Sequence, residues 1–150
     1  MADISFTQNR ELSWLKFDQR VLEEANDRDV PVLERLRFFS IFDTNLEEFF
    51  MVRVGSLTDF KNLKKKPVDS KSGMTSDEQL DAILTDCVDL YKQKDQVYGQ
   101  IVDELKVNGI NLLKVSELSE KDRKSVEYYF NTKIEPVSYT HLTLPTSDLV

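Results

Sequence analysis

The feature that most constrains the fold is an apolar repeat that runs for about 30 residues without a proline. Spacings of three or four residues along such a repeat are typical of one face of an amphipathic helix. We therefore predict one long helix over about residues 77–107, on the order of 45 Å in length at 1.5 Å per residue. The repeat consists of Leu80, Ile83, Leu84, Cys87, Leu90, Tyr91, Lys94, Val97, Tyr98, Ile101 and Leu105.

Both ends of this helix carry boundary signals. Thr75 and Glu78 have the spacing of a capping box, in which each side chain accepts a hydrogen bond from the other residue's backbone, and Ser76 and Gln79 share that spacing. Asn108-Gly109 is typical of a helix C-terminus, because glycine readily adopts the left-handed conformation. The polar segment before the helix, residues 67–76, is predicted to be a loop.

A shorter helix is predicted over residues 13–25, with the Ser13 side chain capping its amino end. Its apolar stripe consists of Trp14, Phe17, Val21 and Ala25, widened by Leu15 and Leu22. The opposite, polar face carries Lys16, Asp18, Gln19, Arg20, Glu23 and Glu24. We therefore expect this helix to lie at the surface of the bundle with Trp14 in the core.

The next helix is predicted to have Pro31 as its first residue, since a missing N–H costs nothing at that position. Its stripe is Val32, Leu33, Leu36, Phe39 and Phe42. Asp43-Thr44-Asn45 then places three cap-forming residues together. Thr44 and Glu47 have capping-box spacing, so we predict that a new helix begins at Asn45, continues to Phe60 and meets the preceding one at an angle.

The pattern changes after Gly109. Residues 110–113 are predicted to be extended, and Ser119 with Asp122 to open a helix that reaches Ile134. The predicted fold class is therefore all-α: an antiparallel helical bundle with one long helix, followed by the truncated start of a second, α+β domain. We expect a helical domain over residues 1–109 and the start of the next domain over residues 110–136.

The last segment has a different character. Residues 137–146 (VSYTHLTLPT) resemble the translation of a sequencing adapter, which makes residues 137–150 an expected non-native tail. The alternative is a native, threonine-rich strand. If the tail is not native, then His141, the only histidine, is not a biological residue and the natural gene continues beyond about Pro136.

Several classes of protein are disfavoured by composition. No apolar run is long enough for a membrane span, and the first residues lack the basic and apolar regions of a secretory signal. A single cysteine, Cys87, forms no intramolecular disulfide and fits a reducing compartment. The net charge of −7 disfavours a nucleic-acid-binding protein, which needs a basic surface. A cytoplasmic protein is therefore expected.

Residues 1–135 contain no recognisable catalytic group of residues. The four glycines are too dispersed for a phosphate-binding loop, and without a native histidine there is no nucleophile–base pair and no histidine metal ligand. Glu47 and Glu48 are adjacent on a helix and diverge, so Glu47 is interpreted as a capping partner. Cys87 lies on an apolar face and is interpreted as a buried core thiol.

The candidate binding residue is Asn45. Its amide can pair with the N6/N7 edge of adenine, and a helix amino end offers free N–H groups to an anion. Alternatively, Asn45 only caps the backbone. The basic run Lys64-Lys65-Lys66 could attract a phosphate chain, but it is interpreted as a solvated helix end.

Two blocks of sequence resemble the opening of bacterial polyphosphate kinase, the large type with phospholipase-D-like catalytic halves. The first is NRELSWL at residues 9–15, followed by Phe17, residues 20–22 and residues 24–25. The second is PVLERLRF at residues 31–38, followed by SIF at 40–42 and NLEEFFMVRV at 45–54. The resemblance is dense over residues 9–57, weaker along the long helix, and returns at YYFNTKIEP, residues 128–136.

The resemblance implies an enzyme that reversibly transfers the terminal phosphate of ATP to inorganic polyphosphate, using Mg²⁺ and a phosphohistidine intermediate. It implies that Asn45 contacts the adenine of ATP, that the catalytic histidines and magnesium ligands lie outside this sequence, and that the fragment alone is inactive. It further implies ADP as product, homo-oligomers formed through this domain, and a cytoplasmic enzyme that can associate peripherally with the inner membrane. The alternative is a helical protein-interaction or scaffold module with no nucleotide contact.

Overall fold

The computed structural model describes residues 7–61, 63 and 67–142, which fold into helices joined by turns and loops. The chain divides into two compact units, Met1–Ile110 and Asn111–Val150. Within the described residues there is no strand, and Val68 and Thr75 form only an isolated β-bridge. The all-α prediction is therefore confirmed. No described helix combines the length and the apolar character needed to cross a membrane.

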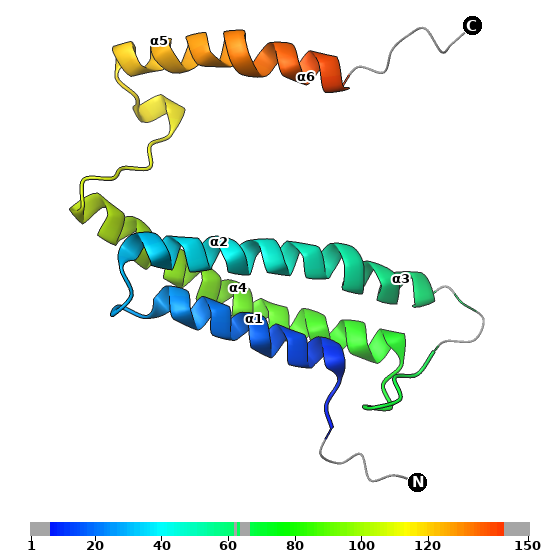
Figure 1. Cartoon of the computed structure of the whole chain (residues 1–150). Helices are drawn as coiled ribbons and strands as arrows, with labels where there is room; N and C mark the ends of the chain where they lie inside the picture. Colours follow the sequence, from blue (N-terminus) through cyan, green and yellow to red (C-terminus); the bar gives the residue numbers. More distant parts are fainter. Residues whose placement is uncertain (1–6, 62, 64–66, 143–150) are drawn as a thin grey trace, which may run out of the picture. The chain divides into compact units, whose positions relative to one another are not determined.

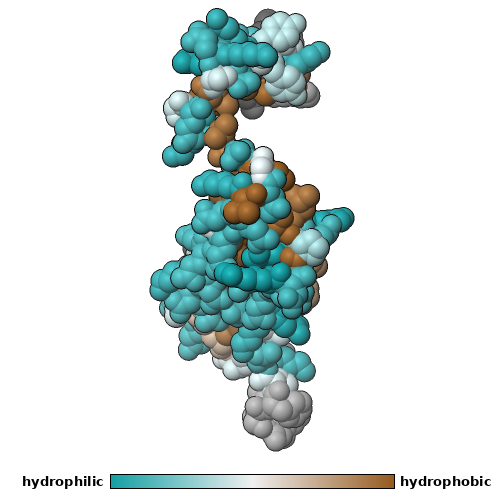
Figure 2. Space-filling model, turned by 90° about the vertical axis from the view of Figure 1, so that its left-hand side faces the viewer, coloured by the Kyte–Doolittle hydropathy of each residue, from teal (hydrophilic) through white to brown (hydrophobic). Residues whose placement is uncertain are grey.

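Three long helical segments form the first unit (Figure 1). They are α1 (Arg10–Asn26), α2 (Val32–Phe49), which continues through η1 (Phe50–Val54) into α3 (Gly55–Lys61), and α4 (Ser76–Val107). The helices α1 and α2 run antiparallel, α4 returns antiparallel to α2, and each of the three packs on the other two. The visible surface is mostly hydrophilic (Figure 2), in keeping with a chain in which 31% of residues are charged.

The amino end of α1 is capped by Asn9, so the prediction of a Ser13 cap is wrong. The Asn9 side chain accepts hydrogen bonds from the backbone N–H groups of Glu11 and Leu12, at 3.0 and 3.2 Å. Its amide nitrogen donates to Gln79 Oε1 at 2.8 Å, on α4. Asn9 is buried because it joins the beginnings of two helices that are far apart in sequence.

The buried face of α1 also differs from the predicted stripe. Leu15, Leu22 and Ala25 are buried, whereas Phe17 is 47% exposed. Asp18, which the sequence placed on the polar face, is fully buried. The predicted buried face was centred on the large aromatic residues, because charge and ring size are the only cues that the sequence gives to which face of α1 is buried. The observed buried face is turned away from that direction about the helix axis.

The helix α2 passes through Asp43-Thr44-Asn45 without a break, so the predicted helix start at Asn45 and the Thr44–Glu47 capping box are wrong. Helix α2 buries Phe39, Phe42, Leu46 and Phe49 at spacings of three and four residues. Burial of each such side chain contributes about 2 kcal/mol, which outweighs a propensity cost of a few tenths at each polar residue. Pro31 lies one position before the first helical residue instead of within the helix.

The segment η1 is a π-helix that interrupts an otherwise continuous helix. Its backbone turns are wider than those of an α-helix, since each N–H bonds to the carbonyl five residues earlier. The chain then resumes as α3, whose Leu57 is buried where α3 packs on α4.

The helix α4 confirms the prediction of one long helix, with an observed range of Ser76–Val107. Thr75 and Glu78 form the predicted capping box, and Asn108 and Gly109 end the helix, Gly109 having φ +80°. Its buried face includes Cys87, Ile83 and Ile101.

A buried arginine ties the three helical segments together near the other end of the bundle. Arg35, on α2, is 1% exposed. It donates to the backbone oxygen of Ala25 at 2.9 Å and to Glu104 Oε2 on α4 at 2.5 Å. No local sequence signal shows that an arginine will be buried.

The second unit contains η2 (Val115–Glu117), α5 (Glu120–Tyr129), η3 (Phe130–Ile134) and α6 (Glu135–Leu142). The Ser119 side chain caps α5 as predicted. Residues 135–142 are helical, so the alternative of a native strand does not hold there. Val137 and Tyr139 are exposed, while the side chain of His141 and all of residues 143–150 lie outside the described residues.

Candidate functional site

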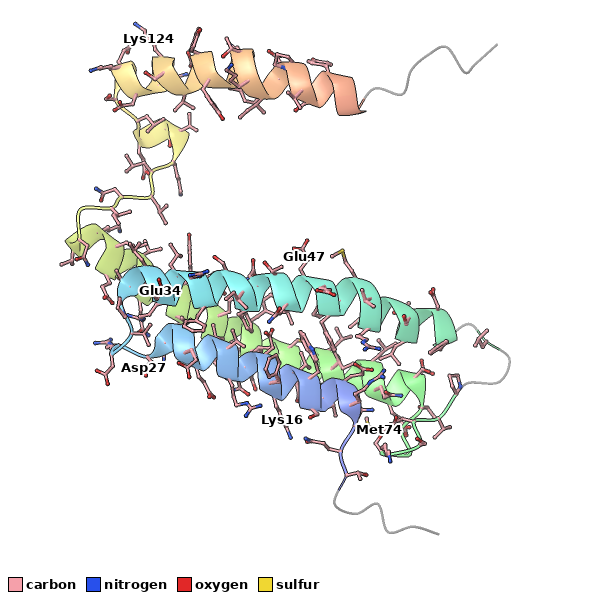
Figure 3. The ribbon with its side chains drawn as sticks, viewed as in Figure 1. Lys16, Asp27, Glu34, Glu47, Met74 and Lys124 are labelled. Atoms are coloured by element: carbon pink, nitrogen blue, oxygen red, sulfur yellow. The ribbon has the colours of Figure 1, made fainter. Side chains whose placement is uncertain are left out.

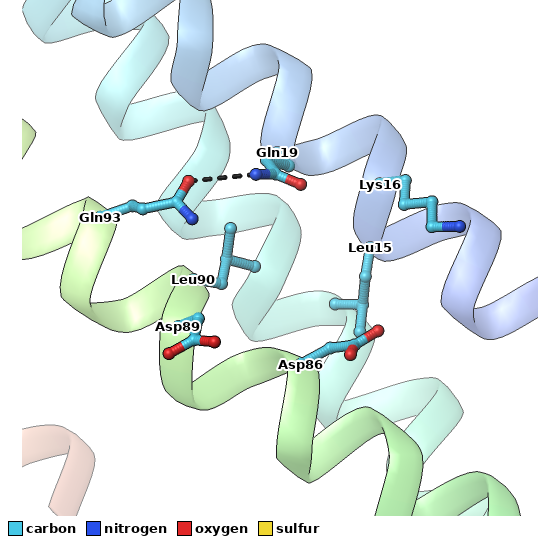
Figure 4. A pocket seen from close by; sticks show the side chains of 7 residues that line it. All are labelled: Leu15, Lys16, Gln19, Asp86, Asp89, Leu90 and Gln93. Atoms are coloured by element: carbon cyan, nitrogen blue, oxygen red, sulfur yellow. Dashed lines mark hydrogen bonds between the residues drawn. The ribbon is translucent and has the colours of Figure 1, made fainter.

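The described part of the first unit has a pocket of about 430 Å³ between the α2–η1 segment and α4, and its lining carries two carboxylates, Asp43 and Glu47, and no cation, which disfavours a phosphorylated ligand. Two smaller pockets that border α1 are also large enough to hold part of a small ligand. One, of about 250 Å³, lies between α1 and α4 (Figure 4), where Gln19 Nε2 donates to Gln93 Oε1 at 3.1 Å. Its lining carries two carboxylates, Asp86 and Asp89, against one cation, Lys16. That charge balance disfavours a phosphorylated ligand, and the lining contains no aromatic ring.

The second pocket, of about 270 Å³, lies between α1 and the α2–η1 segment and contains Asn45. It combines aromatic surface with one amide, one carboxylate and one guanidinium. Aromatic rings together with a few polar groups that fix orientation are typical of pockets for planar ligands. We call it the Asn45 pocket; its lining residues are Trp14, Phe17, Asn45, Glu48, Phe49, Val52 and Arg53.

The aromatic side of the Asn45 pocket is held in place by stacking. The rings of Trp14 and Phe49 are parallel within 6°, with centroids 4.5 Å apart. Phe49 in turn meets the edge of Phe50, with centroids 6.0 Å apart. Trp14 was predicted to lie in the core, and it does pack against the core, but it also borders the pocket. Contacts of this kind keep the rings in fixed positions, so the pocket has a rigid aromatic border.

Asn45 is half-buried, and its amide is oriented by a buried carboxylate. Asn45 Nδ2 donates to Asp18 Oδ1 at 3.1 Å. Burial raises the pKa of Asp18 to about 6, and the hydrogen bond from Asn45 lowers it by less. Among the described residues, Asp18 Oδ2 has no hydrogen-bond partner and is buried. Sequence reasoning found Asn45 and missed Asp18, because a carboxylate is usually exposed and the predicted stripe left Asp18 on the polar face.

Arg53 reaches the same pocket because η1 changes the helical phase. In a regular α-helix a residue eight positions after Asn45 would lie about 80° further round the axis. The wider turns of η1 advance less per residue, which brings Arg53 back toward the face that carries Asn45. No sequence signal for a π-helix was recognised, so this residue was not singled out.

The other predicted features do not join this pocket. Asn45 lies inside a helix, so it offers no free backbone N–H groups to an anion. Glu47 is exposed on α2 (Figure 3) and takes no part in a cap. Burial raises the pKa of the Cys87 thiol to about 11, and this thiol borders neither pocket. The segment Lys64-Lys65-Lys66 lies outside the described residues.

Within the part of the chain that the structure describes, no three His, Cys, Asp or Glu residues are grouped closely enough to hold a metal ion. The Asn45 pocket contains a single carboxylate, from Glu48. Its chemistry is therefore that of recognition: flat apolar surface, an amide that can form hydrogen bonds, one guanidinium and one carboxylate.

Comparison with known proteins identifies the domain. The family model described as the polyphosphate kinase N-terminal domain matches residues 7–113. The chain belongs to this family. The matched range includes every residue of the Asn45 pocket and Asp18.

Curated relatives of the polyphosphate kinase family align with most of the chain. A polyphosphate kinase of Bacillus cereus is 41% identical over 138 residues, covering 91% of this chain and 20% of the relative. One of Halalkalibacterium halodurans is 45% identical over 134 residues, covering 89% of this chain and 19% of the relative. The chain thus spans about a fifth of the length of these relatives.

A solved structure supports the same assignment. The crystal structure of polyphosphate kinase from Porphyromonas gingivalis is similar to this chain with a TM-score of 0.63 and 31% identity. The similarity covers 85% of this chain and 17% of that one. The helical bundle is therefore the amino-terminal fold of the polyphosphate kinase family.

Proposed function

We propose that this helical domain binds the adenine base of ATP in the Asn45 pocket, as part of a polyphosphate kinase. The observation that carries the proposal is that Asn45 lies beside stacked aromatic rings and retains amide hydrogen-bonding groups that no described residue engages. An asparagine amide has one acceptor and two donors, which matches the amino group and adjacent ring nitrogen of adenine.

The remaining pocket residues suit the rest of a nucleotide. The half-buried Trp14 ring offers flat apolar surface to a base, and the buried Phe49 ring stacks against it. Arg53 supplies a positive charge for phosphate oxygens, and Glu48 supplies an acceptor for ribose hydroxyl groups. In the parent enzyme this domain would position the nucleoside so that the terminal phosphate is aligned for transfer.

The proposed parent reaction is reversible transfer of the terminal phosphate of ATP to polyphosphate through a phosphohistidine, with Mg²⁺ supporting the phosphates. The residues for that chemistry are expected outside this chain, so purified residues 1–136 should not transfer labelled phosphate. We include in the proposal self-association of the enzyme through this domain, which analytical ultracentrifugation would detect, and a cytoplasmic location with peripheral contact at the inner membrane.

The binding step is tested directly with the 150-residue chain. Trp14 is the only tryptophan and borders the pocket, so its fluorescence reports occupancy. ATP should change this fluorescence saturably, and Asn45→Ala should weaken binding about 10-fold, the effect of losing one to two hydrogen bonds. Asn111→Ala removes an exposed asparagine outside the pocket and serves as the control, with unchanged affinity.

A kinetic experiment separates this proposal from the scaffold alternative. In a full-length polyphosphate kinase that carries this domain, Asn45→Ala should raise KM for ATP more than KM for polyphosphate. If KM for ATP is unchanged, the domain acts as a helical scaffold without nucleotide contact and the proposed function is wrong.

A further inference from the structure

Asp18 has no place in the pocket lining, yet it is the residue that contacts the Asn45 amide. It is fully buried on α1, where Oδ1 accepts a hydrogen bond from Asn45 Nδ2 at 3.1 Å. Its second oxygen, Oδ2, is buried and has no partner among the described residues. A buried carboxylate with one unsatisfied oxygen is costly, and such a group calls for an explanation beyond packing.

The contact determines which way the Asn45 amide faces. An ionised carboxylate only accepts hydrogen bonds, so only the NH₂ group of Asn45 can face it. The amide oxygen and the second N–H of Asn45 are then left for a ligand. A side chain able both to donate and to accept, such as asparagine, could pair with either end of the amide and would allow it to rotate by half a turn.

We propose that Asp18 is a positioning residue that fixes the Asn45 amide with its oxygen toward the ligand and so selects adenine over guanine. This inference rests on the proposed function of the Asn45 pocket. With the oxygen presented, Asn45 accepts from the N6 amino group of adenine and donates to the neighbouring ring nitrogen N1. Guanine carries the O6 acceptor and the N1–H donor at these two positions, so oxygen would face oxygen and N–H would face N–H.

The variant Asp18→Asn tests this inference with little change in shape. Its amide can donate to Asn45 Oδ1, which lets the Asn45 amide rotate and present NH₂ to guanine O6 and its oxygen to guanine N1–H. We expect wild-type chain to prefer ATP over GTP on the order of 10- to 100-fold, the discrimination of one bidentate pair. Asp18→Asn should reduce that preference to within about threefold, mainly by strengthening GTP binding.

Affinities for ATP and GTP are measured by Trp14 fluorescence and calorimetry at mildly alkaline pH, where Asp18 is ionised. Asp86→Asn provides the matched control, because it removes the same charge from an exposed residue of α4 outside the Asn45 pocket. The Asn45 side-chain amide is followed in parallel by ¹⁵N NMR without nucleotide. A purely structural role for Asp18 would change both affinities equally and would leave their ratio unchanged.

The outcomes are distinct. A lost preference in Asp18→Asn, with a shifted Asn45 amide resonance and a normal ratio in Asp86→Asn, supports the inference. If ATP binds and Asp18→Asn keeps the wild-type ratio, the inference is overturned while the proposed function stands. If the wild-type chain binds neither nucleotide, the proposed function is overturned and the inference falls with it.

Discussion

Replacing Asp18 with asparagine should stabilise the helical domain at neutral pH. The folded state raises the pKa of Asp18 from its ordinary 3.8 to about 6, because burial disfavours the charged form more than Asn45 favours it. A shift of about 2 pKa units corresponds to up to about 3 kcal/mol at 1.36 kcal/mol per unit. Asparagine has the shape of the neutral acid and avoids this cost.

The sign of the pH dependence follows from proton binding. Between about pH 4 and pH 6 the folded state holds the Asp18 proton more tightly than the unfolded chain. The contribution of protonated Asp18 to the free energy of unfolding is therefore fully present at about pH 4 and below, and it is lost as the pH rises through about 6. Asp18→Asn should match wild type at low pH and exceed it by about 1–3 kcal/mol at pH 7.

Urea-induced unfolding, followed by the fluorescence of Trp14 at a series of pH values, measures this difference. Hydrogen bonds from Ser72 and Thr75 lower the pKa values of Asp69 and Glu78. These two groups contribute equally to the stability of wild type and of Asp18→Asn, so their contributions cancel in the difference between the two proteins. Asp86→Asn, at an exposed carboxylate, should show a difference close to zero at every pH. A less stable Asp18→Asn at neutral pH, or a difference independent of pH, would refute the reasoning.

Three further predictions follow from other contacts. Arg35→Met should destabilise the domain by about 1–3 kcal/mol in urea titrations because the Ala25 carbonyl loses its buried donor, whereas Arg37→Met at a 75% exposed side chain should change stability by less than about 0.5 kcal/mol. Thr75→Ala should cost about 1 kcal/mol by removing the α4 cap, and an effect no larger than that of exposed Thr85→Ala would contradict the cap. Cys87 should react with a thiol reagent far more slowly in the native chain than in urea, and equal rates would show that its burial is wrong.

The sequence predicts those helices whose boundaries depend on local contacts. The range of α4 was predicted within one residue because the Thr75–Glu78 box and Gly109 act over a few residues. The break at Asn45 was wrong because tertiary burial of Phe42, Leu46 and Phe49 overrides the preference of three polar residues for helix ends. Cap preference is a local cue, and it says nothing of which face of the helix is buried.

For the candidate site, the sequence identified one residue of the hydrogen-bonded pair. Asn45 was found from its motif, although the predicted helix start at that residue was wrong. Asp18 was assigned to the polar face because a carboxylate is exposed in most proteins. Its role depends on a partner 27 residues away, and such a contact leaves no mark on the local pattern.

The π-helix η1 has a consequence for how this chain tolerates changes in length. Deleting one residue from 50–54 would restore ordinary α-helical hydrogen bonding, so local propensity alone would favour the shorter sequence. Because the wider turn of η1 accommodates one extra residue, the shortened segment would keep Leu57 against α4 and Arg53 near the Asn45 pocket, at close to their present angles about the axis. Deleting a residue from the regular part of α2, between Asn45 and Phe49, would instead turn every later residue by about 100° and move both side chains from their contacts. Loss of a residue within 50–54 should therefore be tolerated far better than loss of one in the α-helix just before it.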